Sequence, residues 1–205
     1  MNKPSFFQRN GVQDFLQLLI FGACVIIGVL VINTYVFRSF SVVGASMQQT
    51  LQSGDRLIVN RIPVTFASIQ GKKYIPKRGE IIVFKNPRFS FGQADEYIVK
   101  RVIAYGGERV VLKDGHYTVY NSTNPLGFNP DDMNDGEPGT PTAGELDVHV
   151  PEGQLFVSGD HRQLDSNGNP YSLDSRNGLG YIPLDDVIGP VGMRIFPFQS
   201  LRTFK

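Results

Sequence analysis

The chain has 205 residues, in which 20 Lys and Arg residues nearly balance 19 Asp and Glu residues. Nucleic-acid binding needs a concentrated positive surface, so this balance argues against a nucleic-acid partner. The only cysteine is Cys24, which lies in an apolar segment, and the rest of the chain therefore has no thiol to oxidise.

An uncharged apolar segment extends from Phe15 to Phe37, after a short tail at residues 1–14. As a helix it would be about 35 Å long at about 1.5 Å per residue, enough for a hydrocarbon core of about 30 Å. A cleaved secretory signal has a shorter apolar core of roughly 7–15 residues. The stretch from Phe21 to Cys24 faintly resembles a lipoprotein cleavage site, but the apolar run continues past it. We therefore expect a retained transmembrane helix at residues 15–37, with the lipid bilayer as a partner.

The charges around this segment suggest its orientation. Lys3 and Arg9 precede it, partly offset by Asp14, and Arg38 follows it. The positive-inside rule then favours a cytoplasmic amino terminus and an extracytoplasmic domain at residues 38–205. That domain carries 18 basic and 18 acidic residues, and its length suits a single hydrophobic core.

Short β-branched and aromatic runs recur through residues 38–205, separated by Gly and Pro clusters. Asp114-Gly115 lies between two such runs and is a strong hairpin signal. No long helical repeat follows the apolar segment, so we expect a mainly β domain built of antiparallel sheets. The expected strands include residues 56–59, 80–84, 97–103, 109–112, 117–120, 155–157 and 187–189.

Residues 121–146 are rich in Asn, Asp, Pro, Gly and Thr, which indicates a long surface loop or a small excursion. Its acidic residues could be considered as ligands for Ca²⁺. Their spacing does not match an EF-hand loop, which needs a Gly and a terminal Glu at fixed offsets. We therefore expect neither a metal ion nor a cofactor. The acidic residues are Asp131, Asp132, Asp135 and Glu137.

Two residues suggest a catalytic pair. Ser46 follows the apolar segment by nine residues, and Lys100 lies within the strand-like run at residues 97–103. A serine hydroxyl is a poor nucleophile without a neighbouring base. An exposed lysine, with a pKa of about 10.4, is protonated at neutral pH, but burial among apolar side chains lowers that pKa. Lys100 is therefore a candidate base if its strand is central, whereas on the solvent face of an edge strand it would stay protonated.

A histidine base is the alternative. His161 lies in the turn-like sequence Gly159-Asp160-His161-Arg162, whereas His116 and His149 lie beside or within strand-like runs. A triad of Ser46, His161 and Asp174 is chemically conceivable. The residue types alone leave both arrangements open.

Read in order, several motifs resemble those of the bacterial type I signal peptidases, which are Ser/Lys proteases of the cytoplasmic membrane. Ser46-Met47-Gln48-Gln49-Thr50-Leu51 resembles their nucleophile motif, Ser-Met-x-Pro-Thr-Leu. Residues 54–60 resemble the motif that follows it, residues 97–108 the lysine motif, and residues 150–162 with 172–176 the last motif. The resemblance extends from the apolar segment almost to the end of the chain.

The resemblance implies roles for these residues. Ser46 would attack the scissile carbonyl, Lys100 would act as its base, and the Ser46 backbone N–H would be one oxyanion donor. Some family members carry a hydroxyl residue at the place of Gly44 as a second donor, so here a main-chain group or water would have to serve. The implied supporting residues are Ser172, which would orient the lysine amine, an ion pair of Asp174 and Arg176, and Asp160 in the same turn.

The resemblance also implies the substrates, which are exported preproteins with signal peptides, cut after small residues in an Ala-x-Ala pattern. An extended substrate would gain backbone hydrogen bonds by strand addition. Shallow apolar pockets would select by excluding bulk, at about 1–3 kcal/mol per methylene. The oligomeric state stays open. The positions that match the pocket linings are Phe40, Val42, Met47, Leu51, Leu57 and Val99.

The chain departs from the family pattern at three places. Gln49 replaces the Pro of the nucleophile motif, and His161 stands where Asn is usual. Residues 163–171 are inserted into the last motif, with a composition that indicates a turn-rich loop near the site.

Two other protein classes are alternatives. A non-catalytic membrane-bound relative that assists the assembly of pili or other surface polymers would be expected to lose Ser46 or Lys100, and this chain keeps both. A self-cleaving repressor-type protein shares Ser/Lys chemistry. It would carry a DNA-binding helical module where this chain has its apolar segment.

Overall fold

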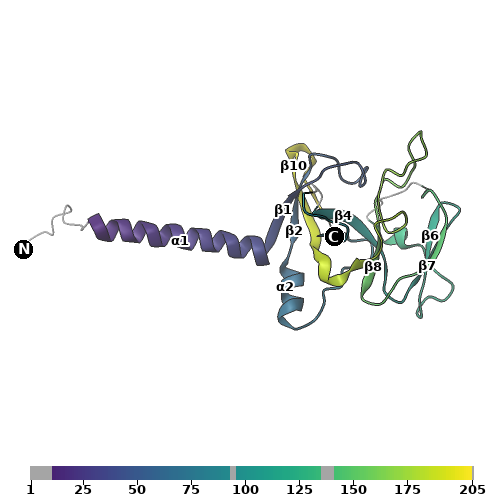
Figure 1. The fold of residues 1–205 in the computed structure, drawn as a ribbon, viewed down its shortest axis with the longest axis horizontal. Coiled ribbons are helices and arrows are strands. Elements are labelled where there is room, and N and C mark those ends of the chain that lie inside the picture. The colour runs from purple at the N-terminus through teal and green to yellow at the C-terminus, as the bar shows by residue number, and fades with distance from the viewer. Residues whose placement is uncertain (1–10, 93–95, 135–140, 205) are drawn as a thin grey trace, which may run out of the picture.

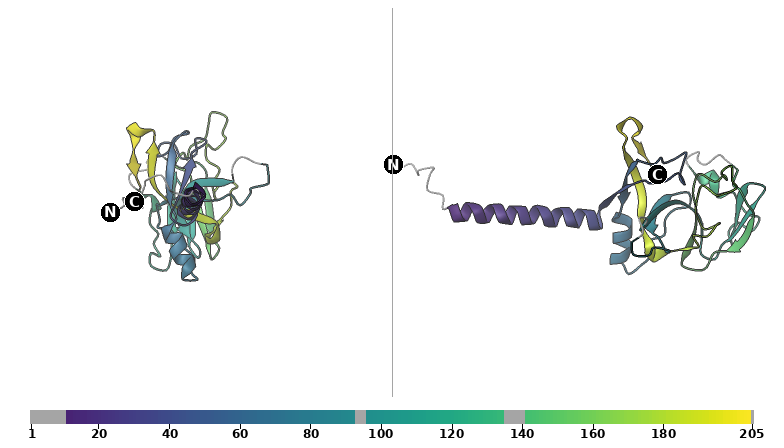
Figure 2. Two further views of the ribbon diagram at one scale, coloured as in Figure 1. Left: turned by 90° about the vertical axis from the view of Figure 1, so that its left-hand side faces the viewer. Right: turned by 45° about the horizontal axis from the view of Figure 1, so that its top comes forward.

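Figure 1 shows the computed structural model of the chain, which describes residues 11–92, 96–134 and 141–204. A single long helix, α1 (Gly11–Tyr35), projects from a β-rich body (Figures 1 and 2). Residues Gln13–Tyr35 are long and apolar enough to span a membrane. The helix ends earlier than the expected span of residues 15–37, because Phe37 already begins strand β1 (Phe37–Ser41), where it pairs with Asn60.

The main sheet has eight strands, and every pairing within it is antiparallel. Its order is β1-β2-β10-β3-β4-β8-β9, with β11 paired to β10, and the sheet curls strongly (Figure 2). The expected mainly antiparallel β architecture is therefore confirmed. The bounds are β2 (Arg56–Asn60), β3 (Ile81–Lys85), β4 (Tyr97–Tyr105), β8 (Gln154–Ser158), β9 (Ile182–Pro183), β10 (Val187–Phe196) and β11 (Arg202–Thr203).

A smaller sheet has the order β6-β5-β7 and is formed by β5 (Arg109–Lys113), β6 (His116–Tyr120) and β7 (Leu146–His149). The expected hairpin at Asp114-Gly115 joins β5 to β6, and both turn residues have positive φ angles, of 51° and 81°. Asp and Gly tolerate this left-handed conformation, which explains the hairpin signal.

Within residues 121–146, several described residues pack against or extend the smaller sheet. Phe128 forms a bridge with Val119, a 3₁₀ helix, η1 (Pro130–Met133), follows, and Leu146 begins β7. The remaining helical segments are α2 (Ile62–Ile69), η2 (Leu184–Asp186) and η3 (Phe198–Ser200).

Helix α2 contacts the end of α1. Thr65 Oγ1 donates to the Tyr35 carbonyl at 2.8 Å, and Arg61 N donates to the Val36 carbonyl at 2.8 Å. The chain beside the end of the apolar helix is therefore fixed by specific hydrogen bonds.

Strand β4 is the strand that positions the site. It lies between β3 and β8, and its five residues from Lys100 to Ala104 are all buried. The flanking strands are highly apolar, with Ile81–Phe84 of β3 and Leu155–Val157 of β8 buried. Because a central strand is covered on both faces, consecutive side chains that point in opposite directions both leave water. This is how two adjacent cations, Lys100 and Arg101, come to lie in the interior.

Candidate active site

Ser46 lies in a tight segment between β1 and β2. Its neighbours Met47 and Leu51 are 1% and 0% exposed and anchor the segment in the apolar core. The Gln48 N–H donates to the Ala45 carbonyl at 3.0 Å, which closes a turn around Ser46. Gly44 has a φ of 96°, a conformation that side-chain-bearing residues rarely adopt. The Gly two positions before Ser46 is thus suited to the local backbone.

Lys100 reaches Ser46 from β4. Its Nζ lies 2.6 Å from Ser46 Oγ, and the residue is only 3% exposed. Burial lowers the pKa of Lys100 to about 8, although the negative charges of Asp174 and Asp160 oppose that shift. A substantial fraction of this amine is therefore neutral near pH 8, so it could accept a proton from the hydroxyl beside it.

Arg101, the next residue along β4, is held by Asp160. Nε and Nη2 of Arg101 donate to the two carboxylate oxygens at 2.8 and 2.6 Å, and Thr50 Oγ1 donates to the same carboxylate at 2.5 Å. All three side chains are buried. The ion pair ties β4 to the turn after β8 and to the segment that carries Ser46.

The turn after β8 leaves no room for a side chain at Gly159. A Cβ there would overlap both the Ser172 hydroxyl and the Ser46 carbonyl. Glycine is therefore required for the close approach of these three segments. We did not single out Gly159 from the sequence, and its place in the last motif was the only available signal.

Ser172 and Asp174 lie on the far side of that turn. Ser172 is fully buried, and among the described residues its hydroxyl has no hydrogen-bond partner. The structure therefore contains no hydrogen bond by which Ser172 would orient the Lys100 amine. Asp174 is also fully buried, accepts from Ser158 Oγ at 3.2 Å, and lies 3.3 Å from Arg176 Nη2.

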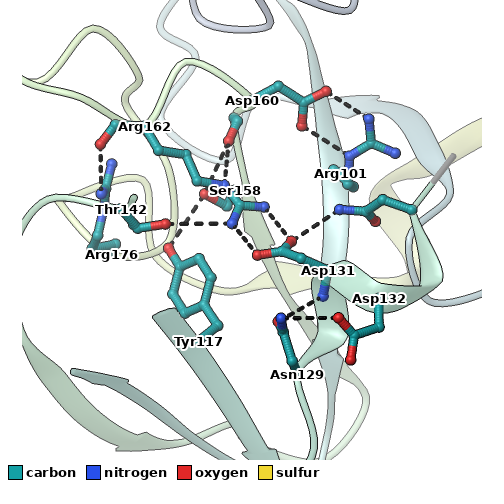
Figure 3. A network of polar contacts seen from close by, with 12 residues as sticks. Arg101, Tyr117, Asn129, Asp131, Asp132, Thr142, Ser158, Asp160, Arg162 and Arg176 are labelled. Atoms are coloured by element: carbon teal, nitrogen blue, oxygen red, sulfur yellow. Dashed lines mark hydrogen bonds and ion pairs between the residues drawn. The ribbon is translucent and has the colours of Figure 1, made fainter. Parts of the chain in front are cut away.

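Figure 3 shows a further ion pair behind the turn, between the buried Arg162 and the partly buried Asp131. The two terminal nitrogens of Arg162 donate to the two Asp131 oxygens at 2.5 and 2.7 Å, and Arg162 Nε donates to the Gly159 carbonyl at 3.1 Å. The Arg162 guanidinium also lies over the Tyr117 ring, 5.0 Å from its centre. The 3₁₀ helix η1 thus supports the turn that contacts Ser46.

The ion pair with Arg162 gives Asp131 a structural role that the sequence did not indicate. Asp131 balances a buried guanidinium, while Asp135 and Glu137 lie outside the described residues. Within the described ranges, no three His, Cys, Asp or Glu side chains are grouped to hold a metal ion. Asp131 is therefore accounted for as an ion-pair partner of Arg162.

His161 contacts the backbone of the Ser46 segment. The backbone N–H of His161 donates to the Ser46 carbonyl at 3.1 Å. The ring Nδ1 lies 3.2 Å from the Ala45 carbonyl and donates to it in the Nδ1-protonated tautomer. In the part of the chain that the structure describes, the Ser46 hydroxyl has one hydrogen-bond partner, Lys100. The geometry thus places Lys100, and not His161, beside the candidate nucleophile.

The family model described as "Signal peptidase, peptidase S26" matches residues 13–196. The chain belongs to this signal peptidase family. The curated relatives include Signal peptidase I P of Bacillus subtilis subsp. natto, which is 30% identical over 212 residues, and the alignment covers 100% of both chains. Signal peptidase I T of Bacillus subtilis (strain 168) is 31% identical over 189 residues, covering 90% of this chain and 88% of the relative.

A crystal structure of a signal peptidase I from Enterococcus faecalis also matches, at 25% identity and a TM-score of 0.40. The match covers 57% of this chain and 96% of the other. Membership of the signal peptidase family identifies the chain as a protease that processes signal peptides, and its apolar helix α1 fits membrane anchoring.

In this signal peptidase, Ser46 and Lys100 are among the residues that line a cleft of about 460 Å³. Four of the six expected pocket residues line it, namely Phe40, Val42, Leu57 and Val99. Met47 and Leu51 are not among its lining residues and lie in the core that anchors the Ser46 segment. The lining residues that the sequence did not indicate are Ser41, Val43, Val83, Tyr97 and Ile98.

Proposed function

We propose that this protein removes N-terminal signal peptides from exported preproteins with Ser46 as the nucleophile and Lys100 as the general base. The observation that supports this most strongly is the 2.6 Å contact between Lys100 Nζ and Ser46 Oγ in a buried setting. Burial holds the pKa of Lys100 at about 8, so the neutral amine is accessible at mild pH.

In the first step, the neutral Lys100 amine takes the Ser46 proton as Oγ attacks the scissile carbonyl carbon. The carbonyl oxygen becomes an oxyanion, for which the Ser46 backbone N–H is a donor. When the C–N bond breaks, the Lys100 ammonium returns its proton to the leaving amine, and an acyl-enzyme remains on Ser46. Water then attacks this ester, Lys100 again moves the proton, and the signal peptide leaves with a free carboxylate.

The lining of the cleft supports the proposal of a preference for small residues before the bond. Most of its lining side chains are apolar, and most come from two segments, residues 40–43 and 97–100. An extended peptide between them would gain backbone hydrogen bonds by strand addition. Phe40 and Tyr97, whose ring centres are 5.2 Å apart, are bulky members of this lining. We therefore propose cleavage after an Ala-x-Ala pattern.

The anchor places the site near its substrates. Only residue Val36 separates α1 from strand β1, which begins the catalytic body. We propose that α1 spans the membrane with a cytoplasmic amino terminus, since Lys3 and Arg9 precede it. A preprotein that is still held in the membrane by its signal peptide would then present its cleavage site on the same side as Ser46.

The test is cleavage of an Ala-x-Ala preprotein by the detergent-solubilised full-length chain and by Ser46→Ala. We expect the variant to lose processing without losing its fold, and Ser68→Ala, an exposed serine on α2, to behave as the parent. Unchanged processing by Ser46→Ala would reject the catalytic proposal. That outcome would favour the alternative of a non-catalytic relative that assists pilus or surface-polymer assembly.

A further inference from the structure

A second pocket lies beside Ser46 and differs in character from the apolar cleft. It has a volume of about 170 Å³ and is lined by Gln48, Gln49, Asp160, His161 and Gln163. The three departures from the family motifs meet here, because Gln49 and His161 line the pocket and Gln163 begins the inserted segment 163–171. Features that looked unrelated in the sequence therefore form one surface.

The position of this pocket follows from the two linings. The apolar cleft is lined mainly by residues 40–43 and 97–100, together with Ser46, Leu57 and Val83. The polar pocket begins two residues after Ser46, at Gln48, and shares no lining residue with the cleft. Its other wall is joined to Ser46 directly, by the hydrogen bond from His161 N to the Ser46 carbonyl. The polar pocket thus adjoins the Ser46 segment without overlapping the apolar cleft.

The pocket has hydrogen-bonding groups that the fold does not use. Within the described residues, the side-chain amides of Gln48, Gln49 and Gln163 have no hydrogen-bond partner, whereas the Asp160 carboxylate is occupied by Arg101 and Thr50. A carboxamide carries both a donor and an acceptor. Three of them together suit a polar peptide segment better than an apolar one.

The wall formed by the inserted segment is held in place. The Asp165 carboxylate accepts from the N–H groups of Asn167 and Asn169, each at 2.8 Å, which closes a tight hairpin. Tyr171, at its other end, stacks on the His161 ring with 3.9 Å between ring centres and 11° between planes. The imidazole in turn contacts the Ala45 carbonyl. The pocket is therefore fixed relative to Ser46 before a substrate binds, which lowers the ordering entropy of binding.

We propose that this polar pocket binds the first residues after the scissile bond, at the start of the mature protein, and favours hydrogen-bonding side chains there. The inference rests on the proposed function, because it needs Ser46 to be the point of cleavage. It adds a specificity site on the opposite side of the bond from the Ala-x-Ala pattern. Its ligand is a polar, extended peptide segment.

The experiment uses preproteins with one Ala-x-Ala sequence and varied residues at the first two positions after the bond. Ser-Gln is compared with Leu-Phe, and kcat/KM is measured for the full-length chain in detergent. One hydrogen bond corresponds to a change of about two- to tenfold in kcat/KM, so we expect the kcat/KM for Ser-Gln to exceed that for Leu-Phe by about tenfold. In Gln49→Ala with Gln163→Ala we expect this ratio to fall below about threefold. Gln52→Ala, an exposed glutamine that lines neither pocket, should keep the parental ratio.

The outcomes separate this inference from the proposed function. A tenfold ratio that disappears in the double variant, while the penalty for a bulky residue before the bond is unchanged, supports the pocket. A ratio that is the same in the parent and the double variant, or near one in both, overturns the pocket while Ser46-dependent cleavage stands. Cleavage that persists in Ser46→Ala overturns both. All glutamines involved are at least partly exposed, and a thermal melt of each variant verifies the fold.

Discussion

Lys100 and Arg101 are neighbouring cations on one strand, and the structure gives them opposite surroundings. Both are buried, at 3% and 4% exposure, and their side chains leave opposite faces of β4. Arg101 has a bidentate carboxylate partner in Asp160, whereas the closest partner of Lys100 is the neutral hydroxyl of Ser46. The difference shows that burial alone does not decide whether a cation supports the fold or carries out chemistry.

The two residue types suit these surroundings for physical reasons. A guanidinium keeps its proton in proteins, and its planar fork matches a carboxylate. A lysine amine loses its proton when it is desolvated without a close counter-charge, so it can become a base. The carboxylates Asp160 and Asp174 raise the pKa of Lys100 less than burial lowers it. Their engagement with Arg101 and Arg176 is consistent with this limited effect.

The largest expected effect comes from replacing Lys100 with arginine, the residue type found at position 101. In Lys100→Arg the group beside Ser46 cannot release its proton at working pH, so general-base catalysis is lost. Such catalysis contributes about 10²–10⁴-fold, and we expect kcat/KM for preprotein cleavage to fall by at least that factor. Lys113→Arg, at an exposed position on β5, is the matched control and should keep full activity. Normal turnover by Lys100→Arg would exclude Lys100 as the base.

Removing Asp160, the ion-pair partner of Arg101, should destabilise the fold. Asp160→Asn leaves Arg101 buried without its counter-charge, and breaking such a pair lowers the free energy of unfolding by about 3–5 kcal/mol. The chain offers a close control in Asp147, which binds Arg109 in the same bidentate way at 2.7 and 2.5 Å but at the surface. Asp147→Asn should lower the free energy of unfolding far less than Asp160→Asn does, because solvent screens an exposed pair. Equal losses in denaturant titrations of the two variants would contradict the role of burial.

The β architecture could be predicted from sequence because its signals are local. Alternating and β-branched runs marked most main strands, and Asp114-Gly115 marked the hairpin between β5 and β6. The end of α1 was placed too late, because the apolar residue Phe37 suits a membrane helix and a strand equally well. Pairing with Asn60 of β2, a long-range interaction, decides between them.

The site was predictable only as separate parts. Motifs singled out Ser46 and Lys100, but no local signal gives the 2.6 Å contact across two distant segments. The pair between Asp131 and Arg162 was missed, since nothing near Asp131 shows that it faces a buried guanidinium 31 residues away. Met47 and Leu51 were assigned to the pocket because their positions match the family's pocket residues. An apolar residue at such a position can equally belong to the hydrophobic core beneath the cleft, as these two do.

A smaller effect, a change in kcat/KM of about tenfold per pH unit, should show the protonation state of Lys100 during turnover. Since its pKa is lowered to about 8, the fraction of neutral amine falls tenfold for each unit below that value. We expect kcat/KM to rise with pH through an apparent pKa near 8 and then level off. A profile that still climbs steeply at pH 10 would mean that the base is not a desolvated lysine.

Stability should respond to pH in the same window, with a sign that follows from proton binding. The pKa of Lys100 is about 8 in the folded state and about 10.4 when the chain unfolds, so the unfolded state binds more protons between these values. The Lys100 contribution to the free energy of unfolding is therefore least favourable below pH 8 and improves as the pH rises towards 10. Lys100→Met removes this contribution, so the variant should be more stable than the parent below pH 8. The difference between the two should shrink between pH 8 and 10 in parallel denaturant titrations, while a constant difference would show that Lys100 keeps an ordinary pKa in the folded protein.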